Sequence, residues 1–474
     1  MEQQLPPPPP PTTKPHFLVI TFPAQGHLKP ALHLAKRLAS SNYADVTFCT
    51  ATAAHCRMFP SLPSPTSSIH HNGITYIPFS DGSSSSSPRH HPSDANLRSF
   101  MFQIKQLGSK HLTSILQDFA NSGRPITCLI YTMMLHWASD VASDLGIPSA
   151  LYWIQAATVM SIYHHFFNGY ESIIVSHAKD PSFPISFPSL PLFQIRDLPS
   201  FVTITSPEEP FFDILDGIRN LFNDLSLRKQ AGGKPRVLVN SFDELEMNAL
   251  ASMEEHMELI TVGPVVQEAA EGETGDMFEE DEKEYMEWLD SQEDTSVVYV
   301  AFGSLHKMSK EEMEEIGKGL IESQRPYLWV VRKDSRWEDV NFDGEEKQGM
   351  VVEWCKQDKV LRHKAVGCFV THCGWNSTLE GLFSGVPAVA MPTWSDQVTN
   401  ACLMLREWGT AVKAEVGENG RVGSGELARC LEIVMGEGER GVDIRMKAEM
   451  WKEKARKAVG EGGSSGKNLK AFAC

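Results

Sequence analysis

One segment of this 474-residue chain, residues 354–397, constrains the fold more than any other. Its middle part, 365–372, is a short and mostly apolar run rich in Val, Cys and Phe, which predicts a buried strand. A turn follows, and Asn376 and Ser377 then stand where a helix cap belongs, ahead of apolar residues at helical spacing. The segment therefore predicts an α/β fold in which a strand delivers polar side chains to the N-terminus of a helix.

A helix N-terminus of this kind favours an anion such as a phosphate, because its unpaired N–H groups and its positive dipole end face the same point. Glu380 lies about one turn further along, where its carboxylate can accept hydrogen bonds from sugar hydroxyls. Trp354 and Trp375 add two aromatic faces, and Asp396 and Gln397 add polar groups beyond the next strand. The implied ligand has a base, a ribose, a phosphate and a second polar moiety, as a nucleotide sugar does.

The order and spacing of these polar and aromatic residues resemble the signature segment of the plant secondary-product glycosyltransferases, a UDP-dependent family. The resemblance extends over nearly the whole chain, from about Phe17 to Phe472. It implies a GT-B fold, with two Rossmann-like domains facing each other across a cleft, and inverting transfer of glucose from UDP-glucose to a small plant metabolite. Tyr131-Thr132 and residues 153–155 resemble the branch that acts on anthocyanin 5-hydroxyls and on hormone or carotenoid-derived carboxylates.

The resemblance assigns most of the segment to binding of the donor. Trp354 is expected to stack on uracil, which contributes about 1 to 3 kcal/mol, and the backbone of Cys355 is expected to bind the edge of the base. Gln357 and Glu380 correspond to ribose-binding positions. The expected phosphate-binding residues are Ser304, His372, Asn376 and Ser377. The residues expected to bind the transferred sugar are Trp375, Asp396 and Gln397.

His27 is the expected catalytic base, which takes the proton of an acceptor hydroxyl. It follows a buried-strand pattern at 16–22 and begins a helix pattern, so it lies at the sheet edge where α/β proteins bind ligands. The helix dipole disfavours a charged imidazole and keeps the ring able to accept a proton. A histidine in a turn is usually structural, and it is the match to the family's glycine-histidine pair that favours catalysis.

Thr132 stands where the family carries an aspartate that orients the catalytic histidine. A threonine hydroxyl can bond to an imidazole, but it cannot stabilise an imidazolium by charge as a buried carboxylate does. We therefore predict an acceptor that needs little help in losing its proton, either a carboxylate or an activated phenol. The residues expected to line its pocket, from their position in the first domain, are Met133, His136, Trp153 and Gln155.

The sequence contains no Asp-x-Asp motif, the usual carboxylate bridge between a divalent metal and a diphosphate. We therefore expect no metal cofactor, and we expect the helix N-terminus and its polar residues to stabilise the leaving group. The pairs His70-His71, His90-His91 and His164-His165 lack the spacing of a metal site and are expected on loops or helix surfaces.

Alternating strand and helix patterns divide the chain into two α/β domains. Residues 1–15 form an expected disordered, proline-rich tail, and 16–262 an acceptor-binding Rossmann-like domain. An acidic linker at 263–293 is expected to lead to a nucleotide-sugar-binding Rossmann-like domain at 294–455. By the resemblance, the tail at 456–474 is expected to pack back on the first domain.

Composition argues against several classes of partner. The formal net charge of −17 disfavours nucleic acid and anionic membranes, since both require a basic surface. Nine cysteines without a C-x-x-C pattern favour reduced thiols in the cytoplasm, and neither a signal-peptide pattern nor a membrane-spanning apolar run is evident. We therefore expect a cytoplasmic monomer whose partners are a UDP-sugar and a small-molecule acceptor.

Two alternative functions fit parts of the sequence. His136 and Asp140 have the H-x-x-x-D spacing of plant CoA-dependent acyltransferases, but that class leaves residues 354–397 unexplained, and a surface pair at helical spacing is the simpler interpretation. A non-catalytic nucleotide-sugar-binding protein would retain the segment but would not need His27.

Overall fold

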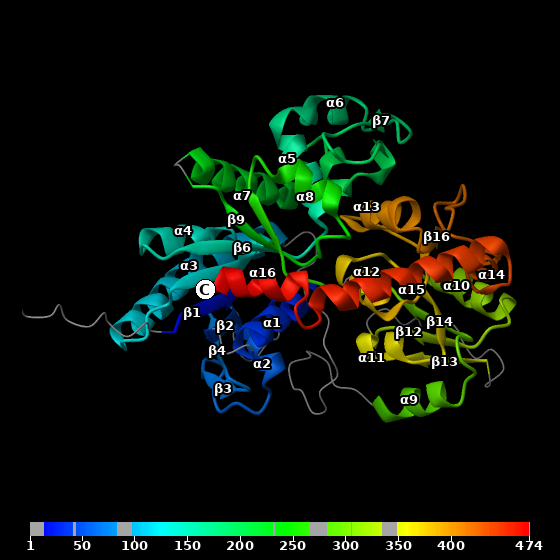
Figure 1. The fold of residues 1–474 in the computed structure, drawn as a ribbon, viewed down its shortest axis with the longest axis horizontal. Helices are drawn as coiled ribbons and strands as arrows, with labels where there is room; N and C mark the ends of the chain where they lie inside the picture. The colour runs from blue at the N-terminus through cyan, green and yellow to red at the C-terminus, as the bar shows by residue number, and fades with distance from the viewer. Residues whose placement is uncertain are drawn as a thin grey trace, which may run out of the picture.

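The computed structural model describes residues 14–40, 44–82, 97–230, 233–265, 282–304, 306–333 and 348–473. The expected proline-rich tail lies outside these ranges except for its last two residues, as do residues 266–281 of the expected linker. The His90-His91 pair also lies outside them. The described residues form two α/β domains, each built around a sheet of mainly parallel strands (Figure 1).

The first domain is built on an eight-stranded sheet with the strand order β10-β9-β6-β5-β1-β2-β4-β3. Only β3 runs antiparallel to its neighbour within this sheet. The central strands are apolar and buried on both faces, as parallel strands covered by helices must be. The strands are β1 (His16–Ile20), β2 (Asp45–Ala51), β3 (Ile69–His71), β4 (Ile74–Phe79), β5 (Cys128–Thr132), β6 (Ser149–Trp153), β9 (Arg236–Val239) and β10 (Glu258–Thr261).

The order of these strands fixes where a ligand can bind. From β1 the chain moves outward to β2 and β4 on one side, and from β5 it moves outward to β6, β9 and β10 on the other. The segments that follow β1 and β5 therefore lie at a topological switch point, where open α/β sheets bind their ligands. Both His27 and Thr132 belong to this point of the sheet.

Helices surround these strands, and the domain also contains a small antiparallel sheet (Figure 1). The helices are α1 (Gln25–Ser40), α2 (Thr52–Met58), α3 (Leu97–Asn121), α4 (Trp137–Asp144), α5 (Ala157–His165), α6 (Glu171–Ser176), α7 (Phe212–Gln230) and α8 (Met247–Met253). The short helical segments are η2 (Met133–Leu135), η3 (Phe166–Tyr170), η4 (Ile195–Asp197) and η5 (Ser200–Thr203). The small sheet pairs β7 (Pro184–Ile185) with β8 (Phe193–Gln194).

The pair His164-His165 ends α5, and every residue of this helix is buried. The Nε2 atom of His165 lies 2.8 Å from the hydroxyl of Ser252, and the ring centroids of His164 and His256 are 4.3 Å apart. The expectation of a loop or helix surface is therefore wrong for this pair, and it is also wrong for His70-His71, which lie on β3. Packing of α5 against α8 encloses both imidazoles, and no periodic pattern within α5 itself reveals this contact.

The second domain is built on a six-stranded parallel sheet with the order β13-β12-β11-β14-β15-β16. The chain moves outward from β11 on one side and from β14 on the other, so the segments after these two strands form a second switch point. The strands are β11 (Val297–Ala301), β12 (Tyr327–Val330), β13 (Gly349–Val352), β14 (Val366–Thr371), β15 (Ala388–Ala390) and β16 (Ala411–Lys413). The helical segments are α9 (Glu282–Asp290), α10 (Lys310–Glu322), α11 (Gln357–Arg362), α12 (Trp375–Ser384), α13 (Gln397–Cys402), η7 (Leu403–Glu407), α14 (Ser424–Met435), α15 (Glu439–Val459) and α16 (Ser464–Ala473).

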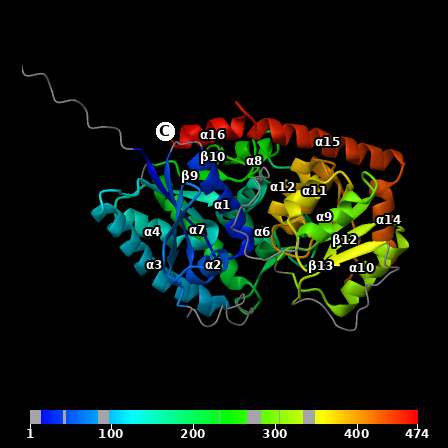
Figure 2. The same ribbon diagram turned by 90° about the horizontal axis from the view of Figure 1, so that it is seen from below.

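The last two helices connect the domains a second time. Figure 2 shows α15 running along the second domain and α16 continuing onto the first. There the amide of Asn468 donates to the carbonyl of Thr261 at 3.0 Å, and the ring of Phe472 packs 5.8 Å from that of Phe17. The boundary expected between residues 455 and 456 falls inside α15, so the crossing itself begins about one turn later.

The two domains also share a hydrophobic core. The main buried cluster of the first domain continues into α12 through Leu379 and Leu382. The indole N–H groups of Trp375 and Trp408 each donate across the interface, to carbonyl oxygens of the first domain at 2.7 and 3.2 Å. These contacts hold the segment after β9 against the start of α12 and the end of η7. Of the helices described, none has the length and apolar character needed to cross a membrane.

Candidate functional site

His27 is the third residue of α1, which begins at the carboxyl end of β1. Its backbone N–H donates to the carbonyl of Ala24 at 2.9 Å, so the imidazole is carried by the first turn of the helix. The ring packs against Phe22, with centroids 5.4 Å apart. At this position the positive end of the helix dipole disfavours a proton on the imidazole, as a general base requires.

Thr132 ends β5 and is completely buried. Its hydroxyl lies 3.3 Å from the hydroxyl of Thr21 and accepts a hydrogen bond of 3.3 Å from the backbone N–H of Phe22. The side chain therefore ties the end of β5 to the end of β1, immediately before the turn that carries His27. A direct role of Thr132 in orienting the imidazole stays a prediction.

The N-cap of helix α12 lies two residues before Asn376, the first of the two expected capping residues. Gly374, in an extended conformation, is its N-cap, and the helix runs from Trp375, so Asn376 and Ser377 lie in its first turn and do not cap it. The turn before it is strained at Cys373, whose φ is 64°. The carbonyl of Cys373 is held by the amide of Asn400 at 2.9 Å, which fixes the turn that aims the helix.

Two glycines surround the imidazole of His372, and the sequence analysis did not identify them. A Cβ on Gly303 would lie 2.6 Å from His372 Nε2, and a Cβ on Gly374 would lie 2.5 Å from the same atom. Only glycine at both positions leaves room for the ring between β11 and α12. Burial, with a smaller contribution from nearby His306, lowers the pKa of His372 to about 4. The ring is therefore neutral at pH 7 and can donate a hydrogen bond without adding charge.

The residues expected to bind the ribose form one hydrogen-bonded group with Ser377. The amide of Gln357 donates to Ser377 Oγ at 2.9 Å and to Glu380 Oε2 at 2.7 Å. The carbonyl oxygen of the same amide accepts from the hydroxyl of Tyr299 at 3.2 Å, a residue the sequence analysis did not identify. Lys29, from the first domain, reaches the other oxygen of Glu380 at 2.8 Å.

The residues expected at the base and the diphosphate occupy neighbouring loops. Trp354 follows β13 with a half-buried side chain, and Cys355 next to it is buried with its sulfur 3.3 Å from the hydroxyl of Tyr299. Ser304 lies in the loop after β11. Asn376 donates from its amide to the carbonyl of Gly26 at 2.9 Å, which brings the first turn of α12 against the first turn of α1.

Asp396 and Gln397, two of the residues expected at the transferred sugar, are nearly buried at the start of α13. Asp396 accepts from the amides of Asn400 at 2.8 Å and Gln155 at 3.2 Å, and burial raises the pKa of its carboxyl group. Gln397 accepts from the backbone N–H of Thr393 at 3.0 Å. Gln155, expected at the acceptor, therefore reaches from the first domain to the expected sugar site.

Two tryptophans differ from expectation. Trp375 was expected to offer an aromatic face to a ligand, but its side chain is buried in the interface and donates to Asn240. Trp153 was expected to line the acceptor pocket, but it is completely buried against Tyr163 and Phe222. Both indoles are buried by residues from segments that are distant in the sequence. Neither side chain therefore offers a face to a ligand, although such a face was expected for the sugar and for the acceptor.

The remaining two acceptor candidates lie after β5. Met133 is buried in η2, and His136 pairs through Nδ1 with Asp224 on α7 at 3.3 Å. The expected surface pair of His136 with Asp140 is therefore replaced by a contact between elements far apart in sequence. Because His136 pairs with Asp224 on α7, its position does not support the acyltransferase function suggested by the H-x-x-x-D spacing.

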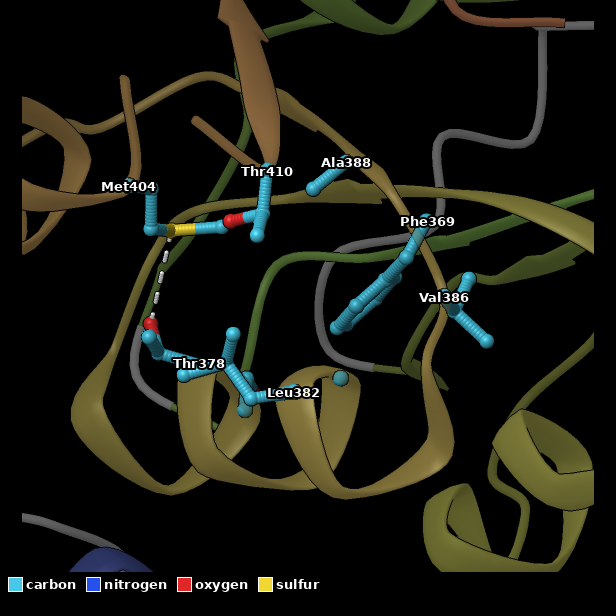
Figure 3. A pocket seen from close by; sticks show the side chains of 9 residues that line it. Phe369, Thr378, Leu382, Val386, Ala388, Met404 and Thr410 are labelled. Carbon is cyan, nitrogen blue, oxygen red and sulfur yellow. Dashed lines mark hydrogen bonds between the residues drawn. The ribbon is translucent and has the colours of Figure 1, made fainter. Parts of the chain in front are cut away.

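A small cavity lies between α12 and the strands β14 and β15 (Figure 3). It is mainly apolar, and the hydroxyl of Thr378 lies at its edge, 3.8 Å from the sulfur of Met404. The residues that line it are Phe369, Ser377, Thr378, Gly381, Leu382, Val386, Ala388, Met404 and Thr410. Because it lies inside the second domain, it is not the acceptor pocket expected on the first domain.

Comparison with known proteins assigns this geometry to a family. Residues 271–447 match the family model described as UDP-glucoronosyl and UDP-glucosyl transferase. The chain is 44% identical to UDP-glycosyltransferase 75C1 of Solanum lycopersicum, over 97% of this chain and 98% of that protein. It is 43% identical to the chloroplastic crocetin glucosyltransferase of Gardenia jasminoides, over 96% of each. Its fold is similar to the crystal structure of Os79 from O. sativa in complex with UDP, with a TM-score of 0.80 and 31% identity over 96% of this chain and 99% of that one.

Proposed function

Since the chain belongs to the UDP-glucuronosyl and UDP-glucosyl transferase family, we propose that it transfers glucose from UDP-glucose, with inversion, to a carboxylate or an activated phenolic hydroxyl of a small plant metabolite. The observation that carries this proposal is the contact between the first turns of α1 and α12. The Asn376 to Gly26 hydrogen bond of 2.9 Å brings the turn that carries His27 against the turn expected to hold the diphosphate. A base and a leaving group positioned in this way suit a single displacement between two domains.

In this proposal the donor lies across the first turns of α11 and α12. Uracil stacks on Trp354, the ribose hydroxyls bind Gln357 and Glu380, and the diphosphate meets the N-terminus of α12. The proposal is supported by the hydrogen bonds that already join Gln357 to Ser377 and to Glu380. A group that is ordered before the donor arrives loses less entropy on binding.

The reaction then needs one bond to form as another breaks. The acceptor oxygen bonds to the anomeric carbon while the bond from that carbon to the β-phosphate oxygen breaks, and UDP leaves with the electron pair. A phenolic acceptor gives its proton to His27, whereas a carboxylate has no proton to give. The N-terminus of α12 and hydrogen bonds from Asn376 and neutral His372 stabilise the charge that develops on UDP.

Thr132 is the reason for proposing an acceptor that ionises readily. In place of a carboxylate, the neutral hydroxyl of Thr132 bonds to Thr21 and to the backbone of Phe22, so it adds no negative charge beside His27. Without such a charge, an imidazolium is less stable and an aliphatic alcohol is a poor substrate. The 43% identical relative from Gardenia jasminoides is named for crocetin, a dicarboxylic acid, which is consistent with this class of acceptor.

A set of three acceptors that share a styrene unit tests this proposal. Cinnamic acid, the phenol 4-vinylphenol and cinnamyl alcohol are offered with UDP-glucose, and product is measured by mass. We expect kcat/KM for the acid or the phenol to exceed that for the alcohol by about tenfold or more, because the alcohol alone requires a strong base. A preference for the alcohol over both other compounds would contradict the proposed acceptor class.

The variant Thr132→Asp tests the proposed acceptor class by changing the protein instead of the acceptor. A carboxylate at the end of β5 is expected to raise turnover of the alcohol relative to that of the acid, because it stabilises a protonated His27. The matched control is Thr132→Asn, which has almost the same size but no charge. Equal gains in both variants would show that charge at this position does not select the acceptor.

We also propose that the transfer needs no metal ion. The diphosphate is met by a helix N-terminus and by neutral hydrogen-bond donors, and the chain has no Asp-x-Asp motif. Initial rates measured with and without an excess of EDTA should agree within about twofold. Loss of activity that magnesium restores would overturn this part of the proposal.

The proposal extends to a monomer that acts in the cytoplasm. Eight cysteines among the described residues are free thiols, and most of them are buried. Reduced thiols persist in the cytosol and are oxidised in the secretory pathway. Light scattering of the purified protein and a fluorescent fusion in plant cells measure the two properties directly.

A further inference from the structure

Lys29 joins the two domains at the expected donor site. It lies in the first turns of α1, two residues after His27, and its ammonium group is 2.8 Å from Glu380 Oε1 on α12. The side chain of Glu380 is only 6% exposed and that of Lys29 is 25% exposed, so water screens this ion pair less than it does a surface pair. The carboxylate expected to bind the ribose therefore already holds a cation from the opposite domain.

The charges of the expected donor site make this cation significant. Its eleven expected residues include two carboxylates, Glu380 and Asp396, and no lysine or arginine. His372 adds no charge at pH 7, because burial lowers its pKa to about 4. The diphosphate of the donor is itself an anion, and it gains negative charge as the sugar leaves. A site with this composition offers the diphosphate a helix dipole and neutral donors but no formal positive charge.

We propose that Lys29 is the counter-charge of the donor diphosphate, supplied by the acceptor domain. This inference rests on the proposed donor site. When the donor binds, the ribose hydroxyls take the place of the ammonium group at Glu380 Oε1, and the ammonium group turns to the phosphate oxygens at the first turn of α12. The step requires only rotation about the side-chain bonds of a flexible lysine, whose ammonium group binds phosphate as a point charge.

The position of α1 makes this movement short. The carbonyl of Gly26 accepts from the amide of Asn376, an expected phosphate-binding residue, at 2.9 Å, three residues before Lys29. Asn376 and Glu380 lie one helical turn apart on the same helix, so both lie within the range of one long side chain. The ammonium group of Lys29 is therefore at the expected ribose position, about one helical turn from Asn376 at the expected phosphate position. Lys29 is a donor-binding residue and is distinct from the base His27.

Binding of three ligands by calorimetry tests this assignment without any turnover. UDP, UMP and uridine are titrated into the full-length protein and into Lys29→Met, Lys29→Arg and Lys452→Met. Lys452 is the matched control, since it forms a 2.9 Å ion pair with Glu449 and its side chain is 21% exposed, but it lies on α15. We expect Lys29→Met to bind UDP about tenfold more weakly than the parent does. Its affinity for UMP should fall by a smaller factor, and its affinity for uridine should stay within about twofold of the parent.

Each of the other variants has a defined result. Lys29→Arg should retain UDP affinity within about threefold because it keeps the charge, and Lys452→Met should bind as the parent does. Equal UDP affinity of Lys29→Met and the parent, or equal loss for uridine and UDP, would show that the ion pair is only structural and would overturn the inference. Failure of the parent protein to bind UDP would instead remove the proposed donor site and the proposed function with it.

Discussion

Replacement of His27 by alanine is expected to lower kcat for a phenolic acceptor by about 10²-fold to 10⁴-fold, the usual contribution of a general base. The imidazole lies in the first turn of α1 at the switch point of the first sheet, against the turn of α12 expected to hold the leaving group. The positive end of the helix dipole disfavours a proton on the imidazole, as a general base requires. Initial rates with 4-vinylphenol and UDP-glucose measure the loss.

The carboxylate acceptor provides the internal control for this prediction. Because cinnamate has no proton to lose at neutral pH, His27→Ala should reduce its glucosylation by a much smaller factor than that of the phenol. Affinity for UDP should stay within about threefold of the parent, since the substitution removes neither a residue expected to bind UDP nor Lys29. Transfer to the phenol at the parental rate would show that His27 is not the base. A parent protein that binds UDP-glucose but transfers nothing would favour the non-catalytic alternative.

The strand-turn-helix at the centre of the donor site was predictable because its signal is local. The apolar run before His372 forms β14, Val366–Thr371, and the periodic residues after it form α12, Trp375–Ser384. Spacing along one helix also places Ser377 and Glu380 on the same side, where Gln357 bonds to both. Such features depend only on the spacing of residues along one helix, and this spacing can be read directly from the sequence.

The parts that were not predictable depend on contacts between distant segments. Gly303 is one of two glycines that admit the ring of His372, but the reason for it appears only when β11 pairs with β14. Lys29 meets Glu380 across 351 positions of sequence, and no local pattern links them. The side chain of Trp375 has an apolar ring and a polar N–H group, so it suits either a ligand site or a buried interface. Only the packing of the two domains shows that it lies in the interface.

Acid is expected to destabilise the protein strongly between about pH 6.5 and about pH 4, because buried histidines must remain neutral in the folded state. His164 packs against His165 and His256, and its pKa is lowered to about 4 by burial, then by these two imidazoles and by Lys229. In the unfolded chain the same imidazole would take up a proton near the ordinary histidine pKa of about 6.5. Between these values the unfolded state binds more protons, so this stabilisation is fully present above about pH 6.5 and is lost as the pH falls from there to about 4.

Other histidines add to this loss. His33, buried in α1, and His372 both have pKa values lowered to about 4, mainly by burial, so each contributes in the same direction and over the same interval. A single group shifted by this amount contributes about 2 to 3 kcal/mol of stability that is lost by about pH 4.5. That is a large fraction of the roughly 5 to 15 kcal/mol that stabilises a typical protein. Urea denaturation at about pH 7.5, 6.0 and 4.5, values on either side of the ordinary pKa of histidine, measures the change in midpoint.

The variant His164→Gln isolates the contribution of the cluster from that of the other histidines. It removes the titrating group but keeps a polar side chain, and we expect it to be less stable than the parent at pH 7.5. Between pH 7.5 and 4.5, however, its free energy of unfolding should fall by about 2 kcal/mol less than that of the parent. The matched control is His70→Gln, in which the replaced imidazole is exposed and bonds to Thr75 at 3.2 Å. Its pH dependence should equal that of the parent. If His164→Gln also keeps the parental dependence, His164 does not take up a proton on unfolding, and the acid sensitivity must come from other histidines whose pKa values burial lowers, such as His33 and His372.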